Sequence, residues 1–287
     1  MDIPIIFQDQ DIVIISKPAG VVVNRATSVR GETLQDWFEE HILDQKKGIE
    51  QVAAATESWQ ELVPADFDTT YGTPEEIFKE RSGMVHRLDK DTSGIMVFAK
   101  NPGALVNLLA QFRNREVSKK YVCLVHGKVQ PDRDIVSAPL GRAQGKNRKK
   151  FQVRPDGRPA ETEYQVLNFW PGFSENAQAN LPKNVTTHPT YQQGFTLVEA
   201  TPHTGRTHQI RVHFAHLGHP LVGDATYTGK KRAGVDSMWC PRHFLHASEL
   251  SILHPRSNQK QTFESDLETD TAAADLSACL HNCLLPK

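Results

Sequence analysis

The stretch of residues 86–94 reads His86-Arg87-Leu88-Asp89-Lys90-Asp91-Thr92-Ser93-Gly94. Its polar residues and closing glycine predict a turn, and the mostly apolar residues 95–100 that follow predict a buried strand. Asn101 and Pro102 then provide an N-cap and a proline at the first position of a helix. A turn at the start of a rigid strand holds its side chains in place, so the arginine and the first aspartate within it form a candidate reactive site.

The rest of the chain predicts more strands than helices, without a regular alternation of the two. This pattern predicts an α+β fold with a mixed, mostly antiparallel sheet. Two short strands are expected in residues 3–24, around the turn Lys17-Pro18-Ala19-Gly20. The other predicted strands are 120–126, 160–169, 195–200 and a final pair within 244–253. Helices are predicted at 33–42, 102–115 and 207–217, and loops at 44–82, 142–158 (a loop or hairpin), 171–190 and 227–242.

The composition is that of a globular protein. At 287 residues, with 38% hydrophobic and 23% charged residues, the chain can form one large core or two subdomains. No apolar run approaches the ~20 residues that cross a membrane, and the N-terminus lacks secretory and transit features, so a cytoplasmic protein is expected. The four cysteines form no paired CxxC motif, so no metal site is expected.

The net charge of −1 hides an uneven distribution of charge. Residues 44–80 hold nine acids and three bases, and residues 264–275 hold five acids and no base, so the remainder is strongly positive. Residues 142–158 hold seven bases and a single acid, and further bases lie at 113–115 and 119–120. Such local fields attract a phosphate backbone whatever the charge of the whole chain, although a solvated basic surface has the same composition.

The stretch 86–94 resembles the signature of the RluA family of RNA pseudouridine synthases, in which the first aspartate of this motif is the nucleophile. Four further blocks resemble motifs of that family and follow the family's order. The blocks are residues 11–23, with the Lys17-Pro18-Ala19-Gly20 turn; 118–127, with Tyr121; 204–213, with Arg211; and 217–224.

The resemblance implies the pseudouridine synthase fold, a long curved sheet with a central cleft flanked by helices and loops. It places the catalytic domain at residues 1–263, with an acidic insertion at 44–82. An acidic tail at 264–287 is expected to be either disordered or a short helix. No RNA-binding extension of the S4 type precedes Lys17, so a bare catalytic domain is expected.

The implied reaction converts uridine into pseudouridine: a carbon–nitrogen glycosidic bond breaks, the base rotates, and carbon 5 joins the sugar. No redox change occurs, so no cofactor is expected. Asp89 is expected to be the nucleophile, which either attacks the sugar or assists loss of the base. Arg211 is expected to keep this carboxylate ionised, because an arginine does not lose its charge. Tyr121 is expected to stack on the uracil and to remove the proton from carbon 5, directly or through water.

The target base must leave its stack to reach Asp89. In this family the arginine of the signature fills the vacancy, which assigns that task to Arg87, while His86 would support the loop or a phosphate. Ribosomal RNA is favoured as the substrate over a transfer RNA stem-loop, and a monomer without membrane or metal partners is the default. The other residues expected to contact RNA are Lys119, Lys120, Arg142, Lys146, Arg148, Lys149, Lys150 and Arg206.

Other classes of protein fit the sequence less well. Asp89-Lys90-Asp91-Thr92 resembles the box of magnesium-dependent phosphotransferases, but that box follows a strongly apolar strand. The histidines between residues 203 and 219 are not spaced to place three on one face with an acidic partner. The main alternative is a non-catalytic RNA-binding or chaperone module on the same fold. The combination of Asp89, Tyr121 and Arg211 argues against it, because binding alone needs none of them.

Overall fold

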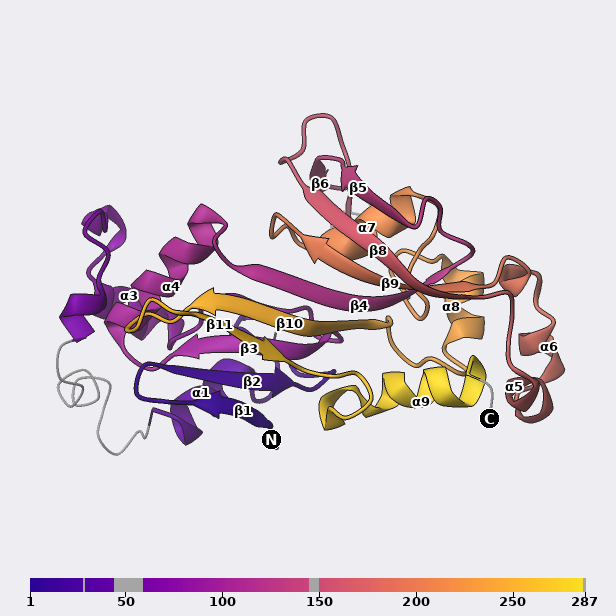
Figure 1. Cartoon of the computed structure of the whole chain (residues 1–287), viewed down its shortest axis with the longest axis horizontal. Helices are drawn as coiled ribbons and strands as arrows, with labels where there is room; N and C mark the ends of the chain where they lie inside the picture. The colour runs from indigo at the N-terminus through magenta and orange to yellow at the C-terminus, as the bar shows by residue number, and fades with distance from the viewer. Residues whose placement is uncertain (28, 44–58, 145–149, 286–287) are drawn as a thin grey trace. The chain divides into compact units, whose positions relative to one another are not determined.

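Strand β3, Ser93–Ala99, begins with the last two residues of the 86–94 stretch and continues through the apolar run that follows (Figure 1). All seven of its residues are buried. The structure is a computed structural model that describes residues 1–27, 29–43, 59–144 and 150–285. The chain folds into two units, Met1–Ser118 with Glu249–Ser265, and Lys119–Ser248 with Asp266–Lys287. Strand β10, Leu245–Leu253, therefore begins in the second unit and ends in the first.

The sheet of the first unit has an entirely buried centre. Strand β1, Ile5–Gln8, pairs antiparallel with β2, Ile12–Lys17, and β2 pairs antiparallel with β3. Strand β10 follows β3 in the sheet order, and β11, Lys260–Glu264, pairs with β10. Every residue of β2 and β3 is buried, as expected for nearly continuous apolar runs, whereas β1 is a largely exposed edge.

One of the predicted strands at the N-terminus is wrong. Both strands precede the turn at 17–20, and residues 21–23 after it form no strand. The backbone carbonyls of Val22 and Val23 accept hydrogen bonds from the amides of Leu34 and Gln35 at 2.8 and 3.1 Å. These residues therefore bind the first turn of a helix instead of extending the sheet.

The described residues of the first unit contain five short helices. They are α1, Leu34–His41; η1, Trp59–Leu62; η2, Thr69–Tyr71; α3, Pro74–Arg81; and α4, Pro102–Asn114. Helices α1 and α4 confirm the predicted ones, whereas α3 lies in the segment expected to be an irregular insertion. Thr73 explains α3, because its side chain accepts from the Glu76 amide and the Glu76 side chain accepts from the Thr73 amide. Residues 44–58 of the same segment lie outside the described residues.

The second unit is built on an antiparallel sheet in the order β10, β4, β9, β8 and β5. Its further strands are β4, Ser118–His126; β5, Arg133–Ser137; β8, Glu161–Trp170; and β9, Phe195–Pro202. A separate hairpin pairs β6, Leu140–Arg142, with β7, Phe151–Val153. These strands confirm the mostly antiparallel sheet and, with the helices, the α+β class.

Helices also occur where the sequence predicted loops. Helix α7, Gln209–His216, confirms the predicted helix after the Gly205 turn. The expected loops 171–190 and 227–242 are partly helical instead, because isolated apolar residues such as Ala177 and Val185 anchor short helical turns to the core. These helices are α5, Glu175–Asn180; α6, Lys183–Thr186; and α8, Lys230–Asp236.

Within the described part of the segment 264–287, residues 274–283 form a helix, one of the two alternatives that were expected. Helix α9, Ala274–Cys283, belongs to the second unit (Figure 1). Its Leu276, Cys279 and Leu280 lie in the core cluster that also holds Phe195 and Trp239. The four cysteines of the chain are buried free thiols. Among the described residues, no helix has the length and apolarity needed to span a bilayer.

Candidate active site

Asp89 lies on a closed turn of the first unit. Leu88 is buried beneath it, Asp89 itself is half-buried, and Arg87 and Lys90 are exposed. The Asp89 carbonyl accepts the amide hydrogen of Thr92 at 3.1 Å, which closes the turn. This bond fixes the backbone of the turn that carries the Asp89 side chain.

Lys17 supports this loop from the interior, a role that the sequence analysis did not assign. The side chain is 0% exposed, and Nζ donates hydrogen bonds to the carbonyls of Pro18 at 2.8 Å, Val21 at 3.0 Å and Lys90 at 2.9 Å. A buried ammonium is costly unless its donors are paired, so these bonds fix the residue next to Asp89. The signal in the sequence was a lysine at the end of an otherwise apolar strand.

His86 holds the start of the same loop against neighbouring elements. Its Nε2 accepts the Val97 amide of β3 at 3.1 Å. Its ring stacks on Phe112 of α4, with 4.9 Å between the ring centroids and 24° between the planes. These contacts are those of a residue that supports the loop.

Arg211 lies on α7 in the second unit and is only 6% exposed. Its Nε and Nη2 donate to Oδ2 and Oδ1 of Asp224 at 2.8 and 2.9 Å, a two-point ion pair. Burial alone would raise the pKa of Asp224, but the bonds from Arg211 outweigh burial and hold that pKa below its ordinary value. Asp224 is the last residue of the 217–224 block, which predicted no role for it, and the structure makes it the residue that orients Arg211.

Strand β4 holds Tyr121, Lys119 and Lys120, which belong to the second unit. Tyr121 pairs with Ala200 of β9 and packs on the apolar cluster around Cys123. Burial lowers the pKa of Lys119. Lys120 lies 3.8 Å from Glu199 in an ion pair. Tyr121 is therefore held on a packed strand directly after two lysines, which have different environments.

Three of the remaining expected RNA contacts lie on or near the β6–β7 hairpin. Arg142, Lys150 and Arg206 are in the described part of the chain, and Arg142 and Lys150 are exposed. The Arg206 guanidinium donates from Nε to the Pro159 carbonyl at 3.1 Å. The other three expected contacts lie outside the described residues; they are Lys146, Arg148 and Lys149.

The expected site residues divide between the two units. His86, Arg87 and Asp89 belong to the first unit, and Tyr121, Arg211 and the other described cations belong to the second.

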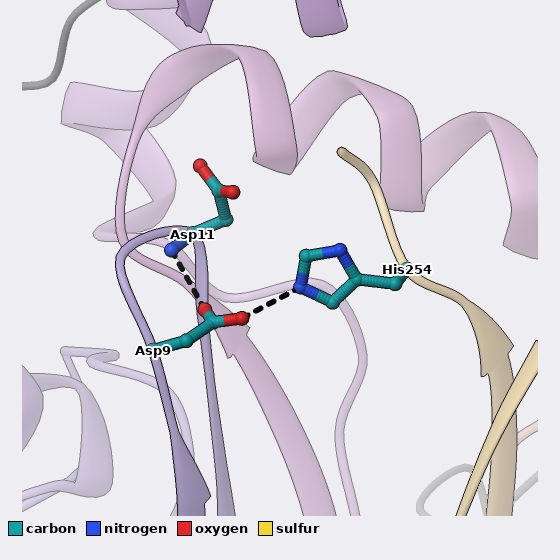
Figure 2. A group of neighbouring side chains, drawn as sticks. All are labelled: Asp9, Asp11 and His254. Atoms are coloured by element: carbon teal, nitrogen blue, oxygen red, sulfur yellow. Dashed lines mark hydrogen bonds and ion pairs between the residues drawn. The ribbon is translucent and has the colours of Figure 1, made fainter. Parts of the chain in front are cut away.

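One group of side chains in the first unit has the composition of a metal site, and Figure 2 shows it: Asp9, Asp11 and His254. Each ligand atom already has a protein partner. Asp9 Oδ1 accepts the amides of Asp11 and Ile12 at 2.8 Å each, and Oδ2 lies 2.7 Å from His254 Nε2. Both oxygens of Asp11 accept from Arg256, at 2.7 and 2.8 Å. The group is therefore an internal clamp between the start of β2 and the segment after β10.

The family model described as RNA pseudouridylate synthase matches residues 11–216. The chain belongs to the RNA pseudouridylate synthase family. The matched span contains Asp89, Tyr121 and Arg211, and it confirms the family resemblance of the sequence motifs. The chain is therefore an RNA pseudouridine synthase, an isomerase that acts on RNA.

Individual relatives agree with this assignment. The synthase is 34% identical over 272 residues to a Bacillus subtilis protein named uncharacterized RNA pseudouridine synthase YlyB, covering 95% of this chain and 71% of that one. It is 35% identical over 272 residues to Ribosomal large subunit pseudouridine synthase D of Nitrosomonas europaea, covering 94% of this chain and 63% of that one. The fold resembles that of Human RNA Pseudouridylate Synthase Domain Containing 1, with a TM-score of 0.62, 22% identity, and coverage of 97% and 87%.

Proposed function

We propose that this synthase isomerises uridine in the RNA of the large ribosomal subunit, with Asp89 as the nucleophile. The observation that carries the proposal is the mounting of Asp89: the residue lies half-buried on a turn whose next residue is fixed by the fully buried Lys17. A reactive group on a rigid loop loses little freedom when it meets its substrate. The name of the Nitrosomonas europaea relative supports a ribosomal substrate over a transfer RNA stem-loop.

The reaction needs three functions, and we assign each to one residue. Asp89 either attacks carbon 1 of the ribose or assists loss of the base, so that the bond to nitrogen 1 breaks. The base rotates and carbon 5 bonds to carbon 1 of the ribose; where Asp89 has attacked that carbon, its bond to Asp89 breaks in this step and the carboxylate is released. Tyr121 then accepts the proton from carbon 5, directly or through water, while nitrogen 1 gains a proton. Arg211 provides the fixed positive charge that keeps the nucleophile ionised.

RNA binding precedes this chemistry. The exposed guanidinium of Arg87 is assigned to the space that the flipped uridine leaves in the stack. The exposed cations Arg142 and Lys150 are assigned to backbone phosphates. Atoms and electrons balance without a cofactor, so we propose none. We also propose that the enzyme is a cytoplasmic monomer.

The experiment is base-resolved mapping of pseudouridine in total RNA from cells lacking this protein. The cells are restored with the wild type or with Asp89→Ala. A ribosomal site that vanishes and returns only with the wild type supports both the reaction and the substrate. If the lost site lies in transfer RNA, the proposed reaction stands and transfer RNA is the substrate instead of ribosomal RNA. Equal restoration of growth by Asp89→Ala, without a restored site, would favour the RNA-binding module over the enzyme.

A further inference from the structure

Tyr227 lies directly against the Arg211 guanidinium, although neither the sequence motifs nor the proposed reaction give it a role. The Arg211 carbon Cζ lies 5.2 Å from the centroid of the Tyr227 ring, within the range of a cation–π contact. The Tyr227 amide also donates to Asp224 Oδ1 at 3.1 Å. The backbone and the ring of one residue thus support both members of the buried ion pair.

The hydroxyl of Tyr227 faces the β6–β7 hairpin. It accepts the Phe151 amide of β7 at 3.1 Å and lies 2.8 Å from Nδ1 of His208. The His208 ring meets the Phe151 ring edge-on, at 6.0 Å and 64°. His208 has a φ of 57°, a left-handed backbone conformation that is uncommon for residues other than glycine. The fold therefore holds the histidine between Tyr227 and the hairpin.

The exposed cations of the hairpin touch the same group of residues. Arg142 lies over the ring of Phe151, with 5.7 Å from its Cζ to the ring centroid. Lys150 Nζ donates to the carbonyl of Thr226, whose amide donates to Asp224 Oδ1 at 2.8 Å. Arg142 therefore contacts Phe151, which bonds to Tyr227, and Lys150 bonds to Thr226, which bonds to Asp224. A phosphate bound to either cation would thus act next to a residue that supports Arg211.

We propose that Tyr227 is a positioning residue that makes the orientation of Arg211 depend on how RNA holds the β6–β7 hairpin. The ring of Tyr227 packs against the Arg211 guanidinium, and its hydroxyl is bonded to the hairpin. A shift of the hairpin therefore shifts the ring that supports the guanidinium. RNA bound at Arg142 and Lys150 fixes the hairpin, and the guanidinium is then held in the orientation that the reaction uses. This inference rests on the proposed function, because it takes RNA to be the partner of the hairpin.

The first test is Tyr227→Phe, which keeps the ring on Arg211 and deletes the hydroxyl. The probe is an in vitro transcript of large-subunit ribosomal RNA, and the readouts are the single-turnover rate at saturating protein and the RNA dissociation constant. We expect the rate to fall about fivefold to tenfold, because the variant loses one or two neutral hydrogen bonds. The RNA dissociation constant should change less. Tyr164→Phe is the matched control, because its hydroxyl bonds to the Pro131 carbonyl at 3.2 Å, a contact outside this network. It should keep the wild-type rate.

A double-mutant cycle separates coupling from a local effect. Arg142→Gln should weaken RNA binding in both backgrounds but should lower the rate only where the Tyr227 hydroxyl is present. Additive losses of rate in the double variant would overturn the inference. A loss of rate that follows the melting temperature in Tyr227→Phe and Tyr164→Phe alike would also overturn it, because the role would then be structural.

A second measurement does not depend on turnover. The Nε–H group of Arg211 is buried and bonded to Asp224, so its nitrogen–proton resonance can be followed in the free protein. Arg142→Gln should shift this resonance in the wild-type background and not in Tyr227→Phe. A shift of equal size in both backgrounds, or in neither, would overturn the inference. If the wild type forms no pseudouridine in any RNA tested, the proposed function fails, and the resonance alone decides on the coupling between the hairpin and Arg211.

Discussion

Lys17 is a charged side chain without exposed surface, and it bonds three backbone carbonyls of the first unit. Lys17→Met removes the donor from all three, so we expect the free energy of unfolding to fall by about 3 kcal/mol. Pseudouridine formation should fall as well, because Lys90 beside Asp89 loses its anchor. Urea unfolding and single-turnover kinetics measure the two effects. The matched variant Lys90→Met changes an exposed lysine on the same loop and should stay within about 0.5 kcal/mol of the wild type. Equal losses in the two variants would contradict this role.

For single residues, the sequence predicted the roles of the residues in the motifs better than the roles of the residues that support them. Asp89 and Arg211 stand in short motifs that can be read locally. Lys17 acts through a carbonyl 73 positions away, and Tyr227 acts through an amide 76 positions away. Such partners meet only in the folded chain, so no local pattern of residues could assign them.

Helix α9 is the element whose contribution differs most from that expected of an acidic tail. Leu276 is 0% exposed and lies in the core cluster of the second unit. Leu276→Ala should lower the free energy of unfolding by about 3 kcal/mol, because it removes buried apolar atoms and leaves a cavity. The control Asn282→Ala changes an exposed position on the same helix and should have little effect. Thermal unfolding of both variants makes the comparison, and a Leu276→Ala protein as stable as the control would show that α9 is not part of the core.

Within the clamp, the ion pair of Asp11 with Arg256 joins the start of β2 to the segment after β10 and should respond to acid. Burial alone would raise the pKa of Asp11, but bonds from Arg256 and Asn101 outweigh burial and hold that pKa below 3.8. A carboxyl with a lower pKa in the folded state stabilises the fold at neutral pH, and this contribution is lost as the pH falls through the folded pKa.

Asp11→Asn should therefore lower the stability near neutral pH and flatten its decline between about pH 5 and pH 2. Urea unfolding over a pH series measures this dependence. Arg256→Met should flatten the same region, because it removes the main partner of the carboxylate. An Asp11→Asn protein with the wild-type decline would show that the clamp does not respond to acid.

Among the elements, the long apolar strands and the helix with a clear N-cap were predictable, and the short helices were not. Strand β3 and helix α4 have an uninterrupted apolar pattern and the Asn101-Pro102 start signal. Helix α3 is short and polar, with Phe78 as its buried residue, so periodicity gave no signal. Its Thr73-to-Glu76 capping box was present in the sequence and could have located it.

At the scale of the whole molecule, the uneven charge should control RNA binding more than the net charge of −1 does. Removing one phosphate contact should reduce the slope of log affinity against log salt by about 1. We expect this change for Arg142→Gln and for Lys150→Gln, measured by RNA titration over a salt series. Glu75→Gln, on the acidic helix α3, should keep the wild-type slope. An unchanged slope in both hairpin variants would place the hairpin outside the RNA footprint.

Strand β10 has a consequence for the way the chain is made. Synthesis on the ribosome runs from the N-terminus, so residues 1–118 emerge well before residues 249–265 complete the same unit. Until then β3 lacks its neighbour β10, and the Asp11 carboxylate lacks Arg256. An open strand edge is a site for wrong pairing between nascent chains. The growing chain must protect its first three strands while the whole middle of the protein is translated, and slow translation of that middle segment would lengthen the exposure.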